Sequence, residues 1–156
     1  MVHVALWEPE IPPNTGNIAR LCAATGAPLH LVGRLGFRLD ASSLRRAGLD
    51  YWDAVELHRH ASWSAFEKAW LDAGGSLERI FCFSANATRP YTEIAFRDGD
   101  CLMFGGESHG LPAELLERQG ERVLTIPMPA GKVRSLNLAT AAGIALYEVL
   151  RQLRKW

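Results

Sequence analysis

The sequence predicts an α/β fold in which a mostly parallel sheet is covered by helices on both faces. Short apolar runs alternate along the chain with segments of helical periodicity. Glycine, proline and asparagine turns separate these segments. A chain of 156 residues suits one core, so we expect residues 1–156 to form a single domain. In such a fold ligands bind beyond the carboxyl ends of the strands.

Each expected element rests on a local pattern. The predicted strands are apolar runs over residues 2–7, 29–32, 54–57, 79–84, 101–104 and 122–128. The predicted helices run from a cap at Asn14 or Thr15 to Gly26, from Asp40 or Ser42 to Arg46, from a capping box of Ser64 and Glu67 to about Ala73, onward from Pro112, and over residues 136–154.

The last predicted helix is apolar around much of its circumference as far as Val149. A helix of this kind is either wholly buried within one chain or packs on a second surface, such as another subunit. The spacing alone leaves both interpretations open.

Composition excludes several classes of protein. Seventeen basic and seventeen acidic side chains give a formal net charge of zero, so overall charge does not draw this protein to DNA or RNA. No apolar run approaches the roughly 20 residues that span a bilayer, and residues 1–7 lack the features of a signal peptide. We therefore expect a cytoplasmic protein without a membrane partner. Cys22, Cys82 and Cys101 are expected to be buried free thiols.

Common cofactor and metal motifs do not occur. No G-x-G-x-x-G follows the first strand, and there is no G-x-x-x-x-G-K-[ST], no H-E-x-x-H and no paired C-x-x-C. His58 and His60 would share one strand face, but we expect them to be flexible surface side chains beside Arg59. The sequence predicts no metal site.

Three loops that follow strands have unusual compositions. They hold Asn14 to Asn17 with Arg20, Phe104 to Leu111, and Ile126 to Pro129 with Ser135 and Asn137. Taken singly, Arg20 fits a surface charge, Glu107 a residue at a helix start, and Asn137 a helix cap. All three loops would lie at one end of a parallel sheet, and their combination favours a site there.

These loops carry a family resemblance. Residues 8–20, Glu-Pro-Glu-Ile-Pro-Pro-Asn-Thr-Gly-Asn-Ile-Ala-Arg, resemble the first motif of SPOUT methyltransferases of the TrmH type. Phe104 to Glu107 with Gly110 to Pro112 resemble the second motif, and Ile126 to Met128 with Ser135 to Leu138 the third. Residues 44–52 are similar to the TrmL (YibK) subgroup, which modifies the anticodon wobble ribose of tRNA. The resemblance covers nearly the whole chain.

The resemblance implies a SPOUT fold whose C-terminal part threads through a loop in a deep trefoil knot, although knots are essentially absent from most folds. It implies a homodimer that transfers a methyl group from S-adenosylmethionine, leaving S-adenosylhomocysteine, to a ribose 2'-hydroxyl of tRNA, with leucine tRNAs expected. The catalytic residues implied are Arg20, Glu107 and Asn137. Arg20 contacts the ribose, while the other two order the loops and help to position the donor or the ribose, with their individual roles left open. Those implied for the donor are Phe83, Gly105, Ile126 and Ser135.

Four further residues are candidates for RNA contacts. Arg45 and Arg46 lie beside Tyr51 and Trp52, and Arg154 belongs to a second basic and aromatic group at the chain end. His109 stands where members of the subgroup usually carry Arg or Lys. Solvated charge remains an alternative for both groups, and dimer packing is an alternative for the aromatic residues near the final helix.

Three rival functions stay open. The first is the same chemistry on another tRNA position or on ribosomal RNA, against which residues 44–52 argue. The second is a catalytically silent RNA-binding module, and the third a flavodoxin-like binding protein. The complete set of Arg20, Glu107, Ser135 and Asn137 argues against the second, and the missing phosphate loop against the third.

Overall fold

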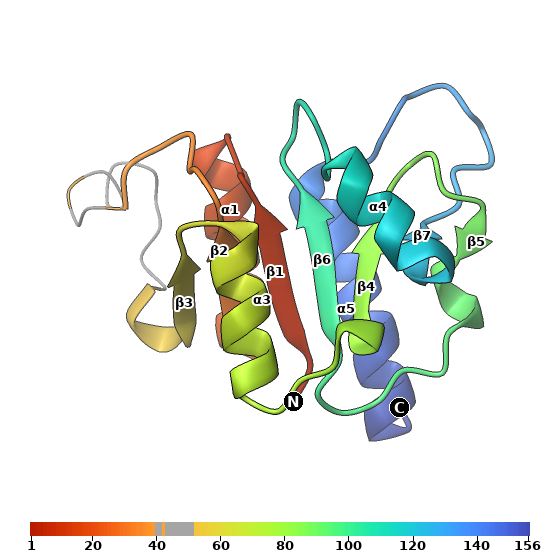
Figure 1. Cartoon of the computed structure of the whole chain (residues 1–156). Coiled ribbons are helices and arrows are strands. Elements are labelled where there is room, and N and C mark those ends of the chain that lie inside the picture. Colours follow the sequence, from red (N-terminus) through yellow and green to blue (C-terminus); the bar gives the residue numbers. More distant parts are fainter. Residues whose placement is uncertain (40–41, 43–51) are drawn as a thin grey trace.

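A seven-stranded sheet organises the computed structural model, which describes residues 1–39, 42 and 52–156. The strand order is β3-β2-β1-β6-β4-β7-β5, and all neighbouring strands run parallel (Figure 1). The strands are β1 (His3–Trp7), β2 (Leu29–Val32), β3 (Leu57–His60), β4 (Ile80–Phe83), β5 (Arg89–Pro90), β6 (Cys101–Gly105) and β7 (Val123–Thr125). The predicted parallel sheet is confirmed.

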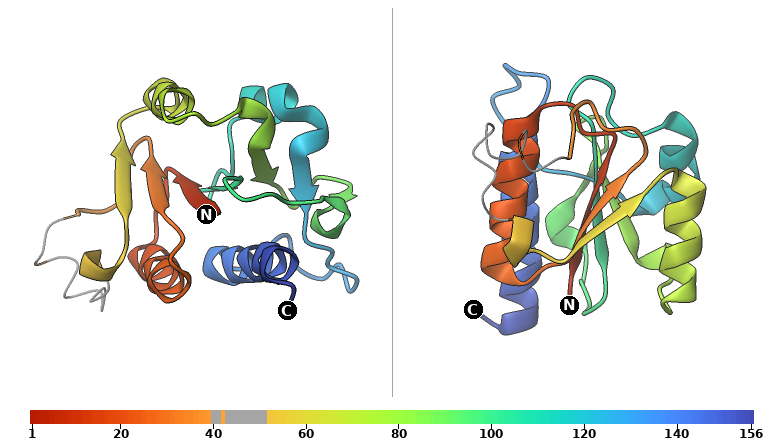
Figure 2. Two further views of the ribbon diagram at one scale, coloured as in Figure 1. Left: turned by 90° about the horizontal axis from the view of Figure 1, so that it is seen from below. Right: turned by 90° about the vertical axis from the view of Figure 1, so that its left-hand side faces the viewer.

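Helices cover both faces of this sheet, as the sequence predicts. Figure 2 shows α1 (Pro12–Thr25) and α5 (Leu138–Arg154) on one face, with α3 (Trp63–Asp72) and α4 (Ala113–Gln119) on the other. Four short 3-10 helices complete the described part: Trp52–Ala54, Leu77–Arg79, Tyr91–Glu93 and Gly120–Arg122. Within the described residues, no helix is both long and apolar enough to cross a bilayer.

The alternation of side chains along the strands builds two apolar layers. Leu6 and Leu102 contribute to the layer beneath α1 and α5, while Ala5 and Met103 belong to the layer beneath α3 and α4. Burying one large apolar side chain contributes about 1.5–3 kcal/mol, so both layers stabilise the sheet. The three cysteines are buried and free, as expected, and burial raises the pKa of the Cys22 and Cys82 thiols to about 12.

Helix α5 is not wholly buried, which settles one question that the sequence leaves open. Leu138, Leu146 and Val149 face the core, whereas Tyr147 is 47% exposed and packs near the C-terminal Trp156. The interpretation of a fully buried helix is therefore wrong, and an apolar surface remains on its outer side.

Two predicted helix starts are wrong by two to four residues. α1 begins at Pro12 after Ile11, so Asn14 and Thr15 lie inside its first turn instead of capping it. The two prolines fit there because the first helical N–H groups have no partner within the helix. In α3 the cap is Ser62, whose Oγ accepts the Ala65 N–H at 3.1 Å. Glu67 instead accepts from Trp63 Nε1 at 2.8 Å, so no Ser64 capping box forms.

Other boundaries also differ. The third strand begins at Leu57 and not at residue 54, because residues 52–54 form a 3-10 helix. The last strand ends at Thr125, three residues early, and Pro112 precedes α4 instead of entering its first turn. β5 is missed since it has only two residues and gains its pairing from the distant β7. The helix predicted from Asp40 or Ser42 to Arg46 lies, apart from Ser42, outside the described residues.

Four histidines form an ordered cluster on the α3 face, so the expectation of flexible surface side chains is wrong. His3 Nδ1 lies 2.9 Å from His30 Nε2, and His30 Nδ1 lies 3.0 Å from His60 Nε2. The His58 ring stacks on His30 at 4.8 Å. β2 supplies the buried His30, against which His58 and His60 of β3 stack while the His3 ring is tilted. Within the described residues, no group of His, Cys, Asp and Glu side chains is arranged to hold a metal ion.

Stability is expected to fall in mild acid because of this cluster. Burial, followed by the charges of His3, His58 and His60, lowers the pKa of His30 to about 3, against 6.5 without these surroundings. Between these values only the unfolded chain takes up this proton, so the free energy of unfolding should decrease by about 2 kcal/mol from pH 7 to 5. The lowered pKa values of His3 and His60 act in the same direction, while Glu56 and the N-terminal amine also face His3.

Urea unfolding of His30→Phe at pH 7 and 5 measures this effect. The variant should lose most of that pH dependence, whereas His109→Asn, altered in an exposed loop outside the cluster, should keep it. Equal pH dependence in His30→Phe and the native chain would contradict the assignment.

Candidate active site

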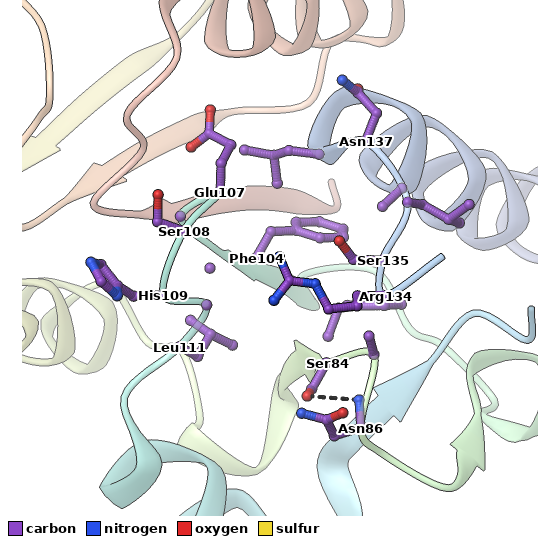
Figure 3. Close-up of a pocket in the computed structure, with 18 of the residues that line it drawn as sticks. Ser84, Asn86, Phe104, Glu107, Ser108, His109, Leu111, Arg134, Ser135 and Asn137 are labelled. Carbon is purple, nitrogen blue, oxygen red and sulfur yellow. Dashed lines mark hydrogen bonds between the residues drawn. The ribbon is translucent and has the colours of Figure 1, made fainter. Parts of the chain in front are cut away.

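The loops after four strands meet around one pocket at the carboxyl edge of the sheet. The register aligns Trp7 of β1 with Gly105 of β6, and Phe83 of β4 with Phe104 of β6, so these strands end together. The pocket has a volume of about 870 Å³ (Figure 3). Its walls come from residues 83–86, 104–111, 125, 126, 128 and 134–138, with Ala113, Leu116 and Ala141 on the helices and Ile11 and Asn14 at the start of α1. This is where the sequence predicts a site.

The floor of the pocket is flat and apolar. The rings of Phe83 and Phe104 stack with centroids 4.8 Å apart and an interplanar angle of 18°. Burying a planar heterocycle beside aromatic and aliphatic side chains is favourable, and backbone groups nearby can bind its polar edge.

Two glycines let backbone segments approach closely at the rim. A Cβ on Gly105 would lie 2.2 Å from the carbonyl carbon of Gly110, and one on Gly106 would lie 2.4 Å from the carbonyl oxygen of Glu8. Both distances are too short for any side chain. The loop after β6 is thereby folded back on itself and set against the loop after β1.

Glu107 joins the loops after β1 and β6. Its carboxylate accepts hydrogen bonds from the backbone N–H of Glu10 and of Ile11, both at 2.8 Å, and from Asn14 Nδ2 at 3.1 Å. Three donors thus occupy the two oxygen atoms. This arrangement orders the start of α1 against the loop after β6, and Glu107 thereby holds the pocket wall together.

The third loop is tied to the same group through two asparagines. Asn137 Nδ2 donates to Asn14 Oδ1 at 3.0 Å, while Asn137 Oδ1 accepts the Thr140 N–H at 3.1 Å. Asn137 is therefore the N-cap of α5, as the sequence suggests for this residue taken alone. It also joins the third loop to the start of α1. One chain of side-chain contacts runs from Glu107 through Asn14 to α5.

Glu10 and Ser108 add a second link between the first two loops. The Glu10 carboxylate accepts from the Ser108 backbone N–H at 3.0 Å and from Ser108 Oγ at 2.8 Å. These bonds, the backbone one first, lower the pKa of Glu10. Its carboxylate remains charged at neutral pH and keeps both bonds.

A model of the SpoU rRNA Methylase family matches residues 1–147. This chain belongs to the SpoU family. The resemblance to SPOUT methyltransferases of the TrmH type is thereby confirmed. A SpoU relative from Saccharophagus degradans, named tRNA (cytidine(34)-2'-O)-methyltransferase, is 47% identical over 154 residues, covering 98% of this chain and 96% of the relative.

Solved structures agree with this SpoU assignment. One, described as giving structural insights into the 2-OH methylation of C/U34 on tRNA, has a TM-score of 0.90 and 52% identity, covering 100% of this chain and 98% of the other. An AdoMet-bound rRNA methyltransferase from Sinorhizobium meliloti has a TM-score of 0.81 and 32% identity, covering 97% of this chain and 56% of that one.

Most of the residues predicted for the site in this SpoU protein line the pocket: Phe83, Gly105, Glu107, His109, Ile126, Ser135 and Asn137. Arg20 does not line the pocket, since it lies on an exposed part of α1. Arg154 ends α5, a helix about 25 Å long that begins at the pocket, so it lies at the far end of the molecule. Arg45 and Arg46 lie outside the described residues.

Sequence reasoning misses the residues that hold the SpoU pocket together. Asn14 appears in it as a possible helix cap and as part of the first loop, Glu10 as part of the first motif and Ser108 as part of the second loop, and none of the three is given a role of its own. Arg134 and Asn86 also line the pocket without having been predicted. A signal for Arg134 exists, because a lone arginine next to a predicted donor-binding serine is a candidate for an anion contact.

Proposed function

We propose that this protein transfers a methyl group from S-adenosylmethionine to the ribose 2'-hydroxyl of the wobble nucleotide, position 34, of tRNA, as one SPOUT domain. One observation carries the proposal: the three motif loops converge on a single pocket and are joined there by Glu107, Asn14 and Asn137. The names of the full-length relatives supply the substrate.

The pocket residues fit this donor. S-adenosylmethionine has an adenine ring and no phosphate, which suits the stacked Phe83 and Phe104 and the absence of a phosphate loop. Gly105, Ile126 and Ser135 would hold it, mainly through backbone groups at the close approach beside Gly110. When bound, the donor supplies an electrophilic methyl carbon on a sulfonium, and the chemistry needs no metal.

Arg20 is the proposed catalytic side chain. Methyl transfer is an in-line displacement, so the ribose oxygen must be held in line and must gain negative charge as its bond to carbon forms. An arginine keeps its proton up to a pH of about 12, so Arg20 is not a general base. Its forked donors instead stabilise the developing oxyanion and fix the adjacent phosphate, and the proton leaves to water or to a phosphate oxygen.

A homodimer reconciles the position of Arg20 with this role. Within one chain Arg20 lies outside the pocket lining, so its own pocket is not where it acts. In a dimer, Arg20 of one protomer faces the pocket of its partner. The exposed Tyr147 on α5 supports such an interface. Sedimentation at micromolar concentration should give twice the mass of one chain, and Tyr147→Glu should shift it toward the monomer.

We also propose the trefoil knot of the SPOUT fold. β7 is inserted between β4 and β5, and the chain then runs from β7 over residues 126–137 to α5 on the opposite side of the sheet (Figure 1). A late segment thus passes between segments that precede it in the sequence. The structural relatives support this topology through their overall agreement.

The side chains proposed to contact RNA are Arg45, Arg46, His109 and Arg154. The proposed substrates are leucine tRNAs, and the proposed compartment is the cytoplasm. His109 is exposed at the pocket mouth. His109→Ala should weaken tRNA binding severalfold in a filter-binding assay, because a contact to an RNA phosphate is lost. His58→Ala, altered away from the pocket, should bind tRNA as the native chain does. Unchanged affinity in His109→Ala would show that His109 is only a loop residue.

One assay tests the function. The protein is incubated with methyl-labelled S-adenosylmethionine and total tRNA from cells lacking the activity, and the methylated nucleotide is mapped. Label at the 2'-oxygen of nucleotide 34 is the expected result. Label at another position would point to the rival RNA substrates, and donor binding without transfer would point to a silent module.

A further inference from the structure

The described lining of the pocket holds one acidic side chain and one permanently basic side chain. Among the described lining residues, Glu107 is the one carboxylate and Arg134 the one permanent cation. Glu107 belongs to the loop after β6, whereas Arg134 belongs to the loop of residues 126–137. The Glu107 oxygens are occupied by three neutral N–H donors, so no cation neutralises this carboxylate through them.

Arg134 is oriented into the pocket. Figure 3 shows its side chain extending from the loop toward Phe104, between Ser135 and the loop that carries His109. Within the described part of the chain, no hydrogen bond or ion pair engages its guanidinium, although two other exposed arginines, Arg118 and Arg151, bond to nearby carboxylates. A guanidinium presents forked donors that match a planar carboxylate.

We propose that Arg134 binds the methionine carboxylate of the methyl donor. The inference rests on the proposed function, since it concerns the donor of that reaction. S-adenosylmethionine carries one carboxylate and two positive groups, the sulfonium and the amine. Arg134, the one permanent cation among the described lining residues, suits that carboxylate. Arg134 thus orients the amino-acid end of the donor while Phe83 and Phe104 hold the ring.

The test compares two ligands that differ by this one group. Titration calorimetry measures the affinity for S-adenosylhomocysteine and for its decarboxylated analogue, in which an aminopropyl chain replaces the amino-acid end. In the native protein the carboxylate should improve affinity. Arg134→Met should lower the affinity for S-adenosylhomocysteine about tenfold, which is the low end for a hydrogen bond to a charged group. The affinity for the analogue should not change. Arg134→Lys should lose less affinity for S-adenosylhomocysteine than Arg134→Met does, because lysine keeps the positive charge.

Lys132→Met is the matched control, because Lys132 is an exposed cation in the same loop but does not line the pocket. It should change neither affinity. If Arg134→Met lost affinity equally for both ligands, the proposal would be overturned in favour of a packing role for Arg134. Unchanged affinity for both, with weaker tRNA binding, would assign Arg134 to an RNA phosphate and also overturn it. Neither result depends on methyl transfer, so each is distinct from failure of the proposed reaction, which the mapping assay detects.

Discussion

Arg20→Ala is expected to lower the turnover number about a hundredfold or more, with little change in donor affinity. This is the scale seen when one donor to a developing oxyanion is removed. Arg20 does not line its own pocket, so its loss leaves the pocket walls in place. Single-turnover methylation of tRNA measures the rate, and calorimetry with S-adenosylhomocysteine measures the affinity.

The control for this substitution is Arg59→Ala, on the exposed side of β3 away from the pocket, which should keep near-native turnover. A second readout tests the subunit arrangement. Mixing Arg20→Ala with a variant whose pocket is defective should restore part of the activity if Arg20 acts on the partner subunit's pocket. Near-native turnover of Arg20→Ala alone would remove this residue from the mechanism.

Gly105→Ala is expected to lower methyl transfer at limiting donor by about a hundredfold. The added methyl group would lie 2.2 Å from the Gly110 carbonyl carbon and 2.4 Å from the Leu111 nitrogen, so the loop must shift by about 1 Å. A displacement of that size at a positioned group can cost a factor of about 100. Donor titration and initial rates at low donor concentration measure the effect.

Gly99→Ala provides the comparison for lost stability. Gly99 has a φ of +92°, so an alanine there is strained, but nothing lies within 4 Å of the new methyl group. This variant should lose stability and keep its donor affinity. If Gly105→Ala bound the donor as tightly as the native chain, the close approach beside Gly110 would not shape the donor site.

The sequence predicts the parallel sheet and the position of the pocket because both depend on local patterns. Apolar runs and the turns after them are short-range features, and the rule that loops follow parallel strands at one edge brings the motif loops together. The same reasoning fails for β5, whose two residues carry no periodicity and whose pairing partner lies more than 30 residues away.

Contacts between distant segments explain the other misses. The bonds from Glu10 to Ser108 and from Glu107 to the start of α1 span more than 90 residues of sequence, and no periodicity encodes them. The histidine cluster likewise arises only because β1, β2 and β3 lie side by side. Arg20 lies on an exposed part of α1 outside the lining of its own pocket, a placement that a motif cannot show. The knot was expected from family likeness alone.

The bond between Asn137 and Asn14 has a consequence for biosynthesis. Translation delivers Asn14 early and Asn137 only with the final helix, so a growing polypeptide on the ribosome holds an unfinished cleft and an uncovered apolar sheet face. Ligand affinity should therefore be acquired in one late step, and prematurely terminated products lacking α5 should be prone to aggregation and to degradation by proteases.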